Sequence, residues 1–215
     1  MSVASLPLLF RNVVDSTRCP FARTASWEEL ASDGALPLVE QAVDAAARLW
    51  QAIPAAEAGG KDMVALRIDS PALTRDFEAF TRFVATVLSH VSRDPRSLGD
   101  DSVMLRYGWR YWVADVQCFV LSFSPIYAPN HPRHSPAGSA FLVFQFESSF
   151  VRNGVSSMTP EQVRKLSQSV KEAFEDGGFD YLAEITHEAP EALHVIKPLR
   201  SGDSPIEWWK HAQHV

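Results

Sequence analysis

Two apolar segments separated by a proline-rich stretch constrain the fold of this chain more than any other feature. Residues 113–123 and 140–146 are short and rich in valine, phenylalanine and leucine, which is typical of buried β-strands. The stretch between them, 124–139, contains four prolines. Because proline has no N–H to donate to a sheet ladder, this stretch must leave the sheet. The pattern predicts a stiff loop on a β scaffold that displays two histidines and an arginine, and loops of this kind often carry sites.

Helical and strand patterns elsewhere in the chain are mixed, without the regular alternation of a parallel α/β fold. The apolar spacing predicts a strand over 63–69 and helices over 36–53 and 72–92, the first of them ended by Pro54. A capping pattern at residues 159–162 predicts a further helix over 159–175. We therefore expect an α+β fold: a single domain over 1–215, with a mostly antiparallel sheet and several flanking helices.

Several shorter segments also carry secondary-structure signals. Ser26 followed by Glu29 resembles a capping box and predicts a helical turn at 26–30. We expect residues 1–24 to be irregular, 181–189 to be helical and 192–199 to form a strand.

Composition and charge exclude several classes of protein. Hydrophobic residues make up 46% of the chain, which is enough for a substantial core, and the net charge of −6 argues against nucleic-acid binding. Two cysteines, Cys19 and Cys118, do not make a disulfide framework. The sequence lacks a basic leader and any run of about 20 apolar residues, so we expect a cytoplasmic protein that does not enter a membrane.

The two loop histidines are the first candidates for a metal site. His131 and His134 lie three residues apart, and imidazole is the usual nitrogen ligand for iron, copper or zinc. A closed zinc site needs four ligands, whereas a haem needs only one axial histidine. Cys19 is an alternative axial ligand, although a free, partly buried cysteine is the simpler interpretation. Solvated loop histidines remain the alternative for the pair.

Other side chains near the loop suggest substrate contacts. Glu147 and Gln145 follow the second apolar run, and a carboxylate there could hold a cationic substrate, or form an ordinary surface salt bridge. Arg133 could bind a haem propionate or a substrate carboxylate. Trp112 could wall a pocket or simply pack in the core.

These residues together resemble one protein family. The Cys-Pro-Phe at 19–21, the stretch 112–134 and the stretch 141–150 are similar to the YqcI/YcgG-like proteins. This resemblance implies a haem-dependent N-oxygenase that binds haem b and hydroxylates an amine or guanidine nitrogen of an arginine-like, amino-acid-derived substrate in small-molecule biosynthesis. It also implies O₂ or peroxide as co-substrate and a separate reductase as electron donor.

The resemblance assigns roles to single residues. It makes His131 the first choice for the axial ligand and His134 the reserve, with Cys19 still open. Arg133, Cys19, Phe21 and Trp112 are then expected around the cofactor, and Gln145 and Glu147 at the substrate. The chain departs from the family pattern at Phe146, where a proline is expected.

Two further functions stay open. One is a haem or small-ligand carrier or sensor without turnover, and the other is a non-haem metal protein that uses His131 and His134 with His187 or His194. The sequence also leaves the oligomeric state open, with a homodimer as one option.

Overall fold

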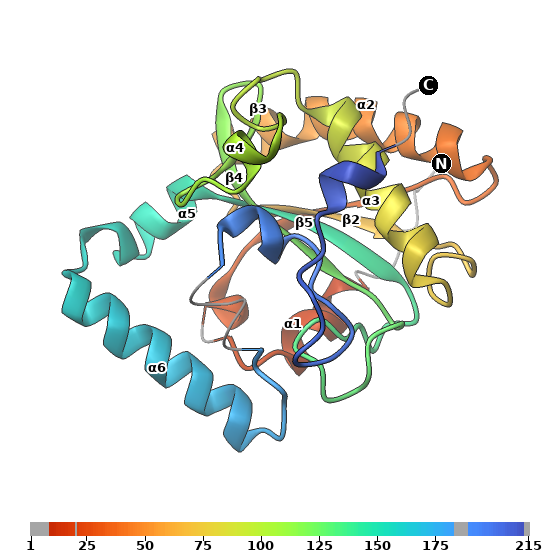
Figure 1. Cartoon of the computed structure of the whole chain (residues 1–215). Coiled ribbons are helices and arrows are strands. Elements are labelled where there is room, and N and C mark those ends of the chain that lie inside the picture. The colour runs from red at the N-terminus through yellow and green to blue at the C-terminus, as the bar shows by residue number, and fades with distance from the viewer. Residues whose placement is uncertain (1–8, 20, 183–188, 213–215) are drawn as a thin grey trace, which may run out of the picture.

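The computed structural model describes residues 9–19, 21–182 and 189–212. A single five-stranded sheet with the strand order β1-β2-β5-β4-β3 lies at its centre (Figure 1). The strands are β1 (Trp27–Ala31), β2 (Met63–Ile68), β3 (Tyr111–Val113), β4 (Val116–Phe123) and β5 (Ala140–Phe146). Only the β1–β2 pair is parallel, and the other three pairs are antiparallel. The expected α+β fold with a mostly antiparallel sheet is confirmed.

One face of the sheet is covered by two long helices, α2 (Leu38–Ala58) and α3 (Phe77–Val91) (Figure 1). Successive side chains of a strand point to opposite faces, so alternate residues of the strands meet these helices. The main core contains Val64 and Leu66 of β2, Phe144 of β5 and Val120 of β4, all with little or no exposure. The 3₁₀ helix η5 (Trp208–His211) adds Trp208 to the same core.

The opposite face of the sheet is covered only in part. Helix α1 (Phe10–Ser16) packs Phe10 and Val13 against Phe141 and Val143 of β5, and forms a smaller core there. Helix α6 (Pro160–Asp176) is the outermost element on this side (Figure 1). The remaining helical segments are short: α4 (Asp101–Met104), α5 (Glu147–Arg152), η1 (Ala22–Thr24), η2 (Val155–Ser157) and η4 (Glu191–His194).

The proline-rich loop leaves the sheet between β4 and β5, as the sequence predicts. A single bridge between Ser124 and His134 ties it back to the end of β4. Most of the first apolar run forms one strand, β4, whereas its first residue, Val113, ends β3. Ala114 and Asp115 adopt φ angles of 45° and 68° and form a tight turn between β3 and β4. Positive φ angles at both central residues suit the twist of a hairpin.

The N-terminal predictions are wrong in two places. Residues 10–16 and 22–24 are helical rather than irregular. Residues 27–31 form β1 instead of a helical turn, because they pair in parallel with β2. Ser26 does not cap a helix: its backbone N–H and its hydroxyl both donate to Asp62 Oδ2, at 2.8 and 2.9 Å.

Two helix boundaries differ from the predicted ones. Helix α2 continues through Pro54 to Ala58, and α3 begins at Phe77 because Asp76 accepts hydrogen bonds from two backbone N–H groups. Helix α6 lies at the predicted place. The strand expected over 192–199 is wrong, since this segment begins in η4, and most of the helix expected over 181–189 lies outside the described residues.

A matched pair of valine substitutions tests the position of the core. Val64 of β2 is 0% exposed and Val151 of α5 is 61% exposed. We expect Val64→Ala to lower the free energy of unfolding by about 1–3 kcal/mol, because it removes two buried methyl groups. Val151→Ala is expected to change it by no more than about 0.5 kcal/mol. Urea denaturation measures both, and equal losses would contradict the assigned faces of the sheet.

Candidate functional site

A cavity of about 370 Å³ lies between the partly covered face of the sheet and α6, and is called the α6 cavity below. Its floor is β4, whose residues Phe119, Leu121 and Phe123 point to this face. The segment that follows α1 and the segment 194–197 close its sides. Its wall on α6 consists of Val163, Leu166, Ser167, Val170 and Phe174.

Helix α6 forms a wall of this cavity rather than part of the core. Thr159 and Gln162 make a reciprocal capping box with Pro160 in the first turn, so the helix start is encoded locally. The apolar residues of α6 recur at three- and four-residue spacing and lie on one face. Phe174 is the only buried residue of α6, and the other apolar side chains that line the cavity stay partly exposed.

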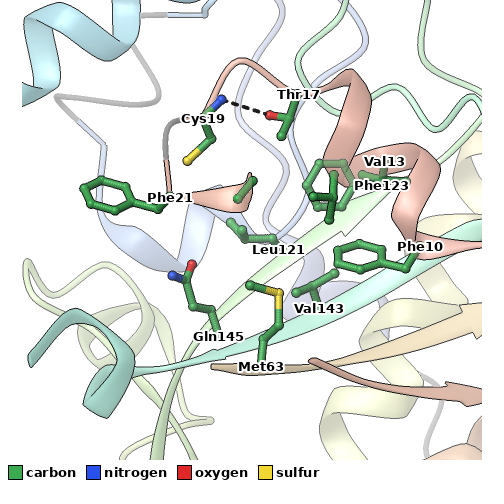
Figure 2. A pocket seen from close by; sticks show the side chains of 12 residues that line it. Phe10, Val13, Thr17, Cys19, Phe21, Met63, Leu121, Phe123, Val143 and Gln145 are labelled. Carbon is green, nitrogen blue, oxygen red and sulfur yellow. Dashed lines mark hydrogen bonds between the residues drawn. The ribbon is translucent and has the colours of Figure 1, made fainter. Parts of the chain in front are cut away.

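A second, smaller pocket of about 80 Å³ adjoins the α6 cavity and shares six lining residues with it. Figure 2 shows Phe10 and Val13 of α1 on one side of this pocket and Met63 and Val143 of the sheet below. The residues common to both are Thr17, Cys19, Phe21, Leu121, Phe123 and Gln145.

Four of the residues predicted from the sequence meet at the α6 cavity: Cys19, Phe21, Arg133 and Gln145. They come from the segment after α1, the proline-rich loop and β5. The backbone N–H of Cys19 donates to Thr17 Oγ1 at 3.3 Å, which fixes the turn that carries the thiol (Figure 2). Burial raises the pKa of Cys19, so the sulfur is a thiol at neutral pH.

His131 does not line the cavity. The residue is 3% exposed, and its ring stacks on Tyr127 with centroids 4.2 Å apart. The backbone N–H of Arg133 donates to Nδ1 of His131 at 3.0 Å, and Nε2 donates to the Pro198 carbonyl at 3.1 Å. Both ring nitrogens are therefore engaged by the protein itself. Burial lowers the pKa of His131 to about 3, which keeps the ring neutral.

The loop was expected to expose its two histidines and its arginine to solvent. This expectation is wrong, because these side chains are buried or half-buried and bond to other parts of the chain. Arg133 is 7% exposed. His134 is half-buried, and its Nδ1 donates to the Tyr127 carbonyl at 2.8 Å. The prolines stiffen the loop, but the stiff loop packs inward against residues 194–198.

Two further predicted residues lie away from the cavity. Glu147 begins α5 and forms an ion pair with Arg110, with Nε and Oε2 3.3 Å apart. Trp112 lies on β3, and the guanidinium of Arg96 stacks on its ring at 4.0 Å. Glu147 thus forms the salt bridge that was the alternative to substrate binding, whereas Trp112 is half-buried and belongs neither to the cavity nor to the core.

His194, Lys197 and Tyr181 line the cavity, and sequence reasoning did not assign them to it. Burial, together with the charges of Arg133 and Lys197, lowers the pKa of His194 to about 4. The signal for Lys197 was present in the sequence: a single lysine within the apolar run 192–199 is expected either to snorkel or to face a polar site. His187, the alternative partner for a metal site, lies outside the described residues.

Comparisons with known proteins add no assignment. No protein-family model, curated protein or solved structure matches the chain. Among the residues that the structure describes, no three histidine, cysteine or acidic side chains are grouped as metal ligands. Within the same residues, no helix is both long enough and apolar enough to cross a membrane. The resemblance to the YqcI/YcgG-like proteins stays a prediction.

The buried neutral His131 predicts a loss of stability in mild acid. Its pKa is about 3 in the folded chain and about 6.5 in the unfolded chain, so the unfolded chain binds the additional proton as the pH falls below about 6.5. We expect this residue to lower the free energy of unfolding by about 1.4 kcal/mol between about pH 7.5 and pH 5.5.

Urea denaturation at the two pH values measures this loss. His131→Gln should reduce the pH-dependent difference by that amount, whatever its effect on absolute stability. His211→Gln, at an exposed position of η5, is the matched control. An unchanged difference in His131→Gln would show that His131 titrates alike in both states.

Proposed function

We propose that this protein binds a small, largely apolar molecule in the α6 cavity. One observation carries the proposal: phenylalanine, leucine and valine side chains of β4 and α6 face a cavity of about 370 Å³ instead of each other. Ligand sites are typically concave and mostly apolar, with a few polar groups that fix orientation. Here the polar groups are contributed by Cys19, Arg133, Gln145, His194 and Lys197.

The free energy for binding would come mainly from apolar surface. Burial of such surface contributes about 25 cal/mol per Å². Helix α6 contributes only Phe174 to the buried residues, so a ligand would add contacts that the helix lacks in the free protein. Binding is therefore expected to stabilise the position of α6 as well as the ligand.

A substitution that fills the cavity tests this proposal. Leu121 lies on the sheet side, where neighbouring strands hold the backbone in place. We expect Leu121→Trp to weaken the binding of the neutral fluorescent probe N-phenyl-1-naphthylamine at least about tenfold, which is about 1.4 kcal/mol. The measurement is a fluorescence titration.

The matched control is Val151→Trp, which adds the same indole to an exposed position of α5. It should bind the probe as the unmodified protein does. Absence of saturable binding to the unmodified protein, or equal affinity of both tryptophan variants, would reject the proposal.

A haem-dependent N-oxygenase is the second candidate, favoured by the sequence resemblance and by the position of Cys19. Of the three axial ligands considered from the sequence, Cys19 lines the α6 cavity and the two histidines do not. Arg133 and Lys197 on the same cavity suit the propionates. In this candidate Cys19 would hold the iron, and the bound haem would supply O₂ or peroxide activation with electrons from a separate reductase.

The substrate side of that candidate is less well supported by the geometry. A guanidine or amine nitrogen carries positive charge, and a carboxylate would be its natural partner. Glu147 is paired with Arg110 away from the cavity, so Gln145 is the remaining candidate of the two. Gln145 offers an amide oxygen as acceptor and an amide N–H₂ as donor.

Titration with hemin separates the two candidates. If haem binds through Cys19, we expect an intense Soret absorption band that Cys19→Ser shifts or removes and that His131→Gln retains. The reverse pattern would reinstate His131 as the axial ligand, and the absence of any band would reject the haem candidate. Circular dichroism of each variant confirms that its fold is intact.

A further inference from the structure

The described residues that line the α6 cavity carry a net positive charge. Arg133 and Lys197 line it and are 7% and 4% exposed. Among the described lining residues, none is an aspartate or a glutamate. His194 on the same wall is neutral, because burial and the two nearby cations lower its pKa. Lys197 Nζ donates to the Tyr181 carbonyl at 3.5 Å. A buried guanidinium such as that of Arg133 is usually paired with an anion, since removing an isolated charge from water is costly.

Arg133 has donor capacity that the described residues do not use. Its Nη2 donates to the His194 carbonyl at 3.1 Å, and its guanidinium lies 5.3 Å from the centre of the Phe123 ring. Its Nη1 is buried and has no hydrogen-bond partner. Burial lowers the pKa of Arg133 to about 10, which still leaves it charged at neutral pH. A buried donor without a partner costs about 1–3 kcal/mol, and more when the group is charged.

The apolar surface of the cavity lies beside this cation. Phe123 contacts the guanidinium and is the last residue of the β4 row that also contains Leu121 and Phe119. Leu166 and Val170 of α6 belong to the opposite wall. The cavity thus offers a cationic donor next to two apolar walls, which matches a molecule with one anionic group and an apolar body.

We propose that the natural ligand of the α6 cavity is an amphiphilic monocarboxylate, whose carboxylate pairs with Arg133 and whose apolar body lies between β4 and α6. This inference rests on the proposed binding function and adds the chemical class of the ligand. A carboxylate accepts two hydrogen bonds from one guanidinium, so it would supply a partner for Nη1. Lys197 would add a second positive charge on the same side of the cavity.

A pair of probes that differ only in charge tests the inference on the unmodified protein. The probes are 11-(dansylamino)undecanoic acid and its methyl ester, each titrated by fluorescence at neutral pH. We expect the acid to bind at least about tenfold more tightly than the ester. If both bind equally well, the carboxylate is not recognised and the inference is overturned, while the proposed binding function stands. If neither binds, the proposed function fails as well.

Variants at Arg133 assign the recognition to one residue. Arg133→Met keeps an unbranched side chain but removes the charge, and should reduce the affinity for the acid about tenfold while leaving the ester within about twofold. Arg133→Lys keeps the charge and loses the planar fork, so it should retain part of the preference. Equal losses for acid and ester in Arg133→Met would mean a general disturbance of the cavity and would count against a direct contact.

Lys197→Met provides an independent check if the Arg133 variants do not fold. It should reduce the preference for the acid less than Arg133→Met does, because Arg133 carries the unpaired donor. Val151→Met, at an exposed position of α5 outside the cavity, is the control that adds a methionine without removing a charge. A Val151→Met protein that lost the preference for the acid would contradict the assigned recognition.

Discussion

Strands β2, β4 and β5 pack one set of alternate side chains against α2 and α3, and turn the other set toward α1 and α6. The first set is buried: Val64, Leu66, Val120 and Phe144 lie in one continuous core with the two long helices. The second set meets α1 at one end only, and the rest faces a cavity. Because both sets belong to the same strands, the stability of the first face holds the second face in position as a rigid floor for a ligand.

Contacts of β4 and of the proline-rich loop with the C-terminal segment hold the polar side of the cavity. Ser122 donates to the Val195 carbonyl through its backbone N–H and its hydroxyl, and the Tyr127 hydroxyl donates to the Lys197 carbonyl at 2.9 Å. His131 adds the bond to Pro198. Each buried polar group in this series receives a partner, with Nη1 of Arg133 as the exception among these residues. An unpaired donor of this kind at a cavity is expected where a bound ligand supplies the missing hydrogen-bond acceptor.

Local sequence signals correctly predicted those features of the backbone that neighbouring residues decide. The capping box at Thr159 placed the start of α6, and the prolines after Phe123 placed the departure of the chain from the sheet. The same kind of signal misled at Ser26, where pairing with β2 decides the conformation, and at Pro54, where packing on the sheet carries α2 onward. In both cases tertiary contacts outweigh a local preference of about 1–3 kcal/mol.

The sequence by itself determined the class of the fold, the loop between two strands, and four residues of the candidate site: Cys19, Phe21, Arg133 and Gln145. Only the tertiary structure decided that Arg133 faces the cavity while His131 turns into a stack with Tyr127, although they are two residues apart. The physical reason is distance along the chain. Arg133 and His131 are bound by carbonyls 61 and 67 residues away, and contacts of that kind leave no periodic signature in the local sequence.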